Sequence, residues 1–302
     1  MIEAWIPVTL AAALFQTWRT ALQQRLKGTL GVEAAAFIRF AYGAPVAFLL
    51  LILLLARPGQ HLPGWGTGFL LLSAGGGLLQ IVATNLLIMA FGYRNFAVGT
   101  AYSKTEAPQA AVMAWLLLDE TLRPLGWLGL LVALAGVMVL SLAASRLTAR
   151  DLVENTLQPA ALCGVGAGFL FALTAICFRA AALSLDSGDV LLRAIFTLAV
   201  TNTLQTVMAG GWLAWRKPDD FARAFSTWRQ SARVGLLSVG GSACWFTAFT
   251  LAPVAPVRAL GQVELLFTLA FSRFYLGERP SRSDILGTAL VVGGVLAVLF
   301  GR

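Results

Sequence analysis

Residues 106–136 read EAPQAAVMAWLLLDETLRPLGWLGLLVALAG, and residues 264–294 read ELLFTLAFSRFYLGERPSRSDILGTALVVGG. When the second stretch is aligned under the first, both glutamates of each stretch coincide, and so do two glycines. Four matches at one spacing indicate an internal repeat. The matched residues, each 158 positions apart, are Glu106 with Glu264, Glu120 with Glu278, Gly129 with Gly287, and Gly136 with Gly294.

The repeat extends toward the start of each half of the chain. At a spacing of 154 positions, Arg25 matches Arg179 and Arg39 matches Arg193. A four-residue difference in the loop before the third helix of each half accounts for the change in spacing. We therefore predict two repeats, residues 1–150 and residues 151–302.

The composition indicates a membrane protein. Hydrophobic residues make up 58% of the 302 residues, glycine adds 30 residues, and only 12% are charged. A soluble domain has roughly 45–50% apolar and about 25% charged residues. Disorder is excluded because it requires low hydrophobicity. The net charge of +8 does not indicate nucleic-acid binding, because no basic run carries interleaved aromatic residues.

Ten stretches of the chain have the length and composition of membrane-spanning helices, which need about 20 mostly apolar residues. Five spans per repeat is an odd number, so the second repeat must enter the membrane from the opposite side, as in many transporters. We predict an all-α integral membrane protein with ten transmembrane helices in two inverted five-helix repeats. The expected spans are 4–23, 33–56, 67–91, 96–117, 125–144, 159–182, 188–213, 232–251, 255–276 and 283–300.

The order of these motifs resembles the drug/metabolite transporter superfamily, specifically its ten-helix members with two EamA domains. The resemblance covers about residues 5–300. It rests on Leu118-Asp119-Glu120 and Leu276-Gly277-Glu278 at the end of the fourth helix of each repeat, on the glycine pairs that follow, and on Arg39 and Arg193. Asp119 departs from the glycine of the family motif. The resemblance implies a transporter, usually an exporter of amino acids, nucleotide-like metabolites or drugs.

We accordingly predict a secondary active exporter of small metabolites such as amino acids or amphipathic drugs, working by alternating access around a central cavity. The alternative is an uncoupled facilitator or channel. No enzyme, cofactor or metal site is expected, because His61 is the sole histidine and Cys163, Cys177 and Cys244 lack metal-ligand spacing. The expected partners are a small-molecule substrate, the lipid bilayer and protons, without nucleic acid, and the expected state is a monomer or homodimer.

Charged residues at membrane depth provide the candidates for transport. Each costs roughly 2.5–3.5 kcal/mol on insertion scales, so such residues usually face a cavity and have a function. Glu106 and Glu264 occupy matched places in two helices, with Lys104 and Arg258 as the nearby cations. We predict that these four couple transport to substrate or protons; the alternative is a structural charge pair. The predicted structural or gate charges are Arg39 and Arg193, expected near Glu33 and Asp189, together with Glu120 and Glu278.

Polar residues within the apolar stretches are the candidates for cavity lining. Gln16, Thr20 and Gln23 share one face of the first helix at helical spacing, and lipid would not accommodate that face. The full predicted lining is Gln16, Arg19, Thr20, Gln23, Gln80, Asn85, Tyr102 and Trp245.

Three local features complete the prediction. Pro108 is expected to interrupt the fourth helix just after Glu106, and Pro253 and Pro256 bracket the start of the ninth. Residues 217–231 place aromatic side chains on one face, which favours an amphipathic helix on the membrane surface over an ordered loop. Lysine and arginine are more frequent in one set of loops by 13 to 4, which places that set in the cytoplasm and both termini outside an inner or plasma membrane.

Overall fold

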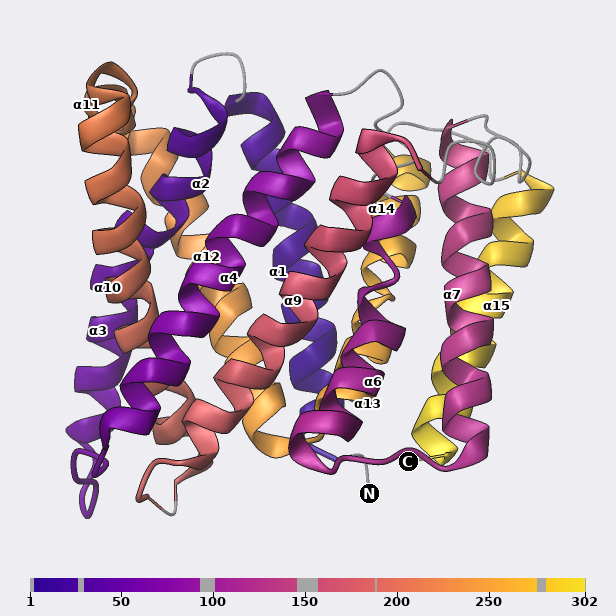
Figure 1. The fold of residues 1–302 in the computed structure, drawn as a ribbon, viewed down its shortest axis with the longest axis horizontal. Coiled ribbons are helices and arrows are strands. Elements are labelled where there is room, and N and C mark those ends of the chain that lie inside the picture. The colour runs from indigo at the N-terminus through magenta and orange to yellow at the C-terminus, as the bar shows by residue number, and fades with distance from the viewer. Residues whose placement is uncertain are drawn as a thin grey trace. The chain divides into compact units, whose positions relative to one another are not determined.

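The computed structural model describes residues 3–26, 30–92, 101–145, 157–187, 189–275 and 281–301. Helices make up nearly all of these residues, and extended pairing within them is limited to an isolated bridge between Gly64 and Asp186. The helices, labelled in Figure 1, are α1 (Trp5–Leu26), α2 (Val32–Ala41), α3 (Gly43–Leu55), α4 (Thr67–Gly92), α6 (Glu106–Leu118), α7 (Pro124–Ser145), α9 (Pro159–Leu183), α10 (Val190–Arg216), α11 (Pro218–Ser226), α12 (Trp228–Leu251), α13 (Val254–Gly261), α14 (Glu264–Tyr275) and α15 (Arg282–Phe300).

The prediction of an all-α membrane protein is confirmed, but the count of ten spanning helices is not. Among the described residues, seven segments are long and apolar enough to cross a membrane. Helix α1 has sufficient length but is not one of them, because Gln16, Thr17 and Arg19 lower its hydropathy. The seven segments are Glu33–Leu55, Thr67–Ala90, Pro124–Ala143, Pro159–Leu183, Val190–Arg216, Trp228–Leu251 and Arg282–Phe300.

Three of the predicted spans are not regular helices throughout: the first remains one spanning segment with a kink, and the other two are interrupted by turns. The span 33–56 divides into α2 and α3 at Tyr42, because Pro45 has no N–H to donate to the carbonyl of Ala41. The span 255–276 divides into α13 and α14. In the span 96–117, the described part has a turn at residues 104–105, so the break precedes Glu106, and Pro108 lies in the first turn of α6 instead of interrupting it.

The described chain forms two compact units, each assembled from two separate stretches. Unit 1 combines Met1–Ile81 with Cys177–Ala252, and unit 2 combines Val82–Ile176 with Pro253–Arg302. Two of the three boundaries fall inside α4 and α9, and the third lies between α12 and α13. Each unit takes segments from both halves of the chain, so the spatial division differs from the division into sequence repeats.

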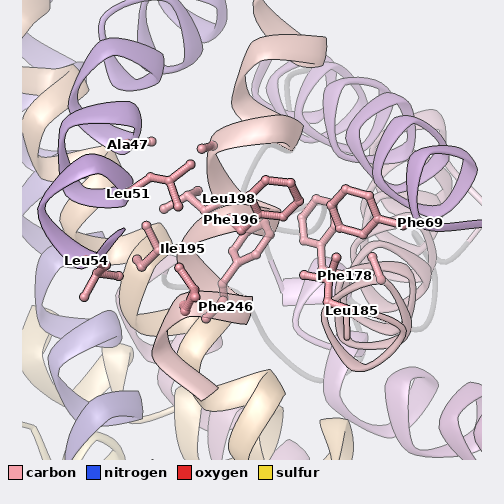
Figure 2. Close-up of a cluster of buried hydrophobic side chains, with 14 of the residues drawn as sticks. Ala47, Leu51, Leu54, Phe69, Phe178, Leu185, Ile195, Phe196, Leu198 and Phe246 are labelled. Carbon is pink, nitrogen blue, oxygen red and sulfur yellow. The ribbon is translucent and has the colours of Figure 1, made fainter. Parts of the chain in front are cut away.

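Unit 1 has an aromatic and aliphatic core contributed by α3, α4, α9, α10 and α12. Phe178 stacks on Phe246 with ring centroids 4.5 Å apart, and Phe69 stacks on Phe196 at 5.4 Å. Figure 2 shows these rings together with aliphatic side chains such as Leu51 of α3. The core therefore joins helices from the two halves of the sequence.

A short amphipathic helix is present within the predicted stretch 217–231, but its aromatic face packs partly against α2. In α11, Phe221 lies 5.6 Å and Phe225 6.2 Å from the ring of Phe37 in α2, measured between centroids. Tyr42 donates a hydrogen bond to the Ala224 carbonyl, 3.1 Å away. The helix is thus anchored to unit 1 by its apolar face.

In unit 2, α7 and α15 lie side by side and run in opposite directions (Figure 1). A Cβ placed on Gly129 would lie 2.6 Å from the Gly294 carbonyl oxygen, and a Cβ on Gly136 would lie 2.7 Å from that of Gly287. Such close backbone approach requires small residues, as at many helix interfaces in membranes. The four glycines that identify the sequence repeat therefore form the contact between these two helices.

Candidate functional site: charges at two helix breaks

The two predicted coupling glutamates each begin a helix directly after a break. Glu106 is the first residue of α6 and Glu264 is the first residue of α14. The breaks lie at matched positions of the repeat, at residues 104–105 and 262–263. Each is a turn closed by hydrogen bonds between residues three apart, namely Lys104 N to Ala101 O, Thr105 N to Tyr102 O, Gln262 N to Ala259 O and Val263 N to Leu260 O, all 3.1 Å long.

Two ion pairs cross between the breaks. An Nη of Arg258 lies 2.9 Å from Oε1 of Glu106, and Nζ of Lys104 lies 3.8 Å from Oε2 of Glu264. The four side chains are only 14–22% exposed. Each glutamate is therefore neutralised by a cation from the other half of the sequence, and α6 packs directly on α13.

The position of the two carboxylates at helix starts adds to their stabilisation. The first turn of a helix carries unsatisfied N–H groups and the positive end of the helix dipole. A negative charge there gains typically 0.3–1 kcal/mol at exposed sites, and more where it is partly buried. The ion pair and the position at a helix start thus both stabilise the negative charge of Glu106 and that of Glu264.

The first break is also held by neighbouring polar groups and by α9. The Gln109 amide donates a hydrogen bond to Oγ1 of Thr105 at 2.6 Å, and Oγ1 of Thr105 donates to the Tyr102 carbonyl at 2.6 Å. A Cβ on Gly168 of α9 would lie 3.0 Å from the carbonyl oxygen of Ser103. The break therefore lies close against α9, and a side chain at residue 168 would fit only if the backbone of the break shifted slightly.

Glu120, predicted as a structural or gate charge, contacts a helix start. Its Oε2 accepts a hydrogen bond of 3.0 Å from the backbone N–H of Val254, the first residue of α13. The contact is equivalent to capping, since it satisfies an N–H that has no partner within the helix. Glu278, its partner in the repeat, lies outside the described residues.

We expect Glu120→Ala to lower the free energy of unfolding by about 0.5–2 kcal/mol, the usual cost of a lost helix cap. Glu120→Gln retains an acceptor oxygen and is expected to lose less than half as much. Thermal unfolding of the purified variants in detergent measures both. Equal losses for the two variants would show that the negative charge, and not the hydrogen bond, stabilises this region.

Three of the predicted lining residues, Gln16, Gln80 and Trp245, form hydrogen bonds in two places within unit 1. Nε1 of Trp245 donates a hydrogen bond of 3.1 Å to Oε1 of Gln16, which joins α1 to α12. Nε2 of Gln205 donates to Oε1 of Gln80 at 2.7 Å and to the Gly77 carbonyl at 3.2 Å. Sequence reasoning missed Gln205, although a glutamine inside an apolar stretch is the same signal that identified Gln80.

The remaining predicted lining residues have less defined surroundings. Arg19, Asn85 and Tyr102 are half-buried. The side chains of Thr20 and Gln23 lie outside the described part of the structure. A lining role for the eight residues stays a prediction.

The predicted acidic neighbours of Arg39 and Arg193 have other partners. Both carboxylate oxygens of Glu33 accept hydrogen bonds of 2.8 Å from Nζ of Lys217. Asp189 caps α10 through the Leu192 N–H at 2.9 Å and accepts a hydrogen bond from Gln60 at 3.0 Å. Within the described residues, Nε of Arg39 and Nε of Arg193 are buried without a hydrogen-bond partner. The gate or structural role of both arginines stays a prediction.

Comparison with known proteins agrees with this architecture. The chain is a multi-pass membrane protein built from two repeats that carry paired charges at helix breaks. It belongs to the EamA-like transporter family, whose model matches residues 3–142 and 158–300. A solved structure titled "Crystal structure of protein" superposes with a TM-score of 0.76 at 15% identity, covering 100% of this chain and 98% of that chain. No curated protein matches the chain.

Family membership settles the general function. EamA-like proteins are transporters, so a small-molecule substrate and the lipid membrane are the partners of this chain. The predicted resemblance to two-domain drug/metabolite transporters is confirmed by the two family matches.

Proposed function

We propose that this protein is a secondary active transporter that exports a small polar or amphipathic metabolite by alternating access. The crossed ion pairs Glu106–Arg258 and Lys104–Glu264 carry the proposal. Charges at membrane depth are rarely retained without a role in binding or coupling. Here they occur twice, at matched positions of the repeat and at helix breaks, where transporters commonly bind their substrates and ions.

The coupling step that we propose is that each carboxylate exchanges its cation partner for a proton or for a charged group of the substrate. In the structure, each glutamate is neutralised by a cation from the other half of the sequence. Protonation of Glu106 or Glu264, or the approach of a charged substrate group, removes the attraction that holds α6 against α13. The two halves of each broken helix then change their angle at the turn, where bonds between residues three apart replace the regular helical ladder.

We further propose that residues 1–150 and residues 151–302 are the two repeats and that they have inverted topology in the membrane. The opposite directions of α7 and α15, which meet through matched glycines, support the inversion. We propose that both termini lie outside the cytoplasm. Lysine and arginine are more frequent, by 13 to 4, in the loops on the side of the membrane opposite the termini, and this excess supports the orientation.

The test is counterflow of solutes in proteoliposomes loaded with a mixed metabolite pool and analysed by mass spectrometry. Wild-type protein is expected to exchange a few solutes and to respond to a pH gradient. Glu106→Gln with Glu264→Gln is expected to reduce gradient-driven flux about tenfold or more, the size of effect that 1–3 kcal/mol of coupling free energy produces. A matched control, Asp119→Asn with Asp219→Asn, removes two exposed carboxylates outside the cluster.

The outcomes separate the candidate functions. Loss of flux in the cluster variant alone supports coupling through these carboxylates. Unchanged pH-driven flux in that variant would rule it out. Flux that shows neither saturation nor counterflow would identify a channel, and saturable counterflow that responds to no ion gradient would identify an uncoupled facilitator.

A further inference from the structure

A basic and aromatic surface lies where α10, α11 and α12 meet in unit 1. Between residues 212 and 233 there are five cations and two acids. All five cations are exposed, and so are three tryptophans. The cations are Arg216, Lys217, Arg223, Arg229 and Arg233, the acids are Asp219 and Asp220, and the tryptophans are Trp212, Trp215 and Trp228.

Two of the cations are already neutralised by acids. Lys217 binds Glu33 at 2.8 Å, and an Nη of Arg223 lies 3.5 Å from Oδ1 of Asp220. In the described part of the chain, Arg216, Arg229 and Arg233 form no ion pair. The surface therefore keeps an excess of positive charge after its internal pairs are counted.

Two of these arginines are held over tryptophan rings. The guanidinium carbon of Arg216 lies 4.7 Å from the ring centroid of Trp215, and that of Arg229 lies 5.5 Å from the ring of Trp228. Trp215 is 74% and Trp228 57% exposed. A guanidinium stacked in this way keeps its planar N–H donors free for two-point contact with phosphate oxygens.

The length of α10 places the surface at the level of the lipid headgroups. At about 1.5 Å per residue, its 27 residues span roughly 40 Å, close to the thickness of a bilayer with its headgroups. The start of α10 is tied to the loop after α3 by the Gln60–Asp189 bond. Its other end carries Trp215 and Arg216, and α12 begins at Trp228. Exposed indoles at the ends of spanning helices typically lie at the membrane interface.

We propose that this surface binds the phosphate of an anionic phospholipid, with Arg216 and Arg229 as its main contacts. The two indoles lie against the glycerol and upper acyl region, and the guanidinium groups bind the phosphate. Because these basic residues lie at one end of α10 and α12, such a lipid is restricted to the leaflet at the level of α11. The exposed indoles favour a lipid over a soluble anion, because a soluble anion would leave them without an apolar partner.

The test uses the full-length protein in detergent micelles and counts bound lipids by native mass spectrometry. Phosphatidylglycerol and phosphatidylcholine with the same acyl chains are titrated separately. Wild-type protein is expected to bind phosphatidylglycerol more tightly. Arg216→Gln with Arg229→Gln is expected to lose roughly 20- to 30-fold in that affinity, about fivefold for each basic residue at an anionic surface.

The matched control is Arg57→Gln with Arg123→Gln, which removes two exposed arginines elsewhere in the chain and is expected to change the affinity less than about twofold, since those sites are outside the contact surface. An equal loss in the control, or no loss in the first variant, would overturn the proposal. So would displacement of the bound lipid by soluble glycerophosphoglycerol, which would identify a site for a free anion.

A further double variant guards against misfolding. Arg216→Lys with Arg229→Lys keeps the charge but lacks the planar fork of N–H donors. It is expected to lose severalfold in affinity while unfolding at the wild-type temperature. Full affinity in this variant would indicate diffuse attraction to anionic membranes in place of a headgroup site. None of these measurements depends on transport.

Discussion

Arg258→Glu is expected to abolish transport and to destabilise unit 2 strongly. The substitution places a third carboxylate against Glu106, where an Nη of Arg258 now lies 2.9 Å from Oε1. Breaking a buried ion pair by removing one partner costs about 3–5 kcal/mol, because a buried charge is left uncompensated. Charge reversal adds repulsion to that loss. Thermal unfolding in detergent and counterflow in proteoliposomes measure the two effects separately.

The double reversal, Arg258→Glu with Glu106→Arg, distinguishes structure from coupling. It restores opposite charges at the same two positions, so we expect most of the lost stability to return. If flux returns as well, the pair has a structural role and the position of the acid is unimportant. If the protein regains its unfolding temperature but not its gradient-driven flux, the carboxylate has to stand at the start of α6, as the proposed mechanism requires.

Gly294→Leu is expected to separate α7 from α15 and to prevent folding of unit 2. A Cβ at this position would lie 2.6 Å from the Gly129 carbonyl oxygen and closer still to the backbone nitrogen of Ala133. Backbone atoms cannot move aside as a flexible side chain can. The loss is therefore expected to exceed the usual 1–3 kcal/mol of an overpacked core. The yield of monodisperse protein and its unfolding temperature are the measurements.

The neighbouring glycine supplies a closely matched control. Nothing lies within 4 Å of a Cβ built on Gly293, which is exposed. Gly293→Leu has the same change in composition and helix propensity, one residue away. It is expected to leave the unfolding temperature near that of the wild type, or to raise it slightly. A comparable loss in both variants would mean that the helix contact is not what requires glycine at residue 294.

Much of the fold was predictable because it depends on local chemistry. A spanning helix satisfies its own backbone hydrogen bonds and must present apolar side chains to lipid, so the composition of each stretch was sufficient to predict α4, α7, α9, α10, α12 and α15. The matched Glu106 and Glu264 were sufficient to select the candidate site. The broken spans were harder to predict, because Pro108 points to a kink near Glu106 but does not show that the turn lies at residues 104–105.

The tertiary structure decided which groups meet. Arg258 and Glu264 are separated by only six residues, yet each pairs with a residue of the other repeat. Likewise, only the structure shows that the amide of Gln205 bonds to Gln80, which lies 125 positions earlier in the chain. Such pairings depend on how helices pack, and helical periodicity contains no information about which helices become neighbours.

The sequence by itself determined that this chain is a membrane protein, that its two halves are related, and that two acids recur at matched depth. These properties follow from the hydropathy of single stretches and from identities at fixed spacing. Only the tertiary structure decided that the repeat glycines bring α7 against α15 and that the acids begin helices after a break. It also decided that each acid is neutralised by a cation of the other repeat. Close backbone approach and charge pairing depend on which two helices are in contact, and a single stretch of sequence does not specify that.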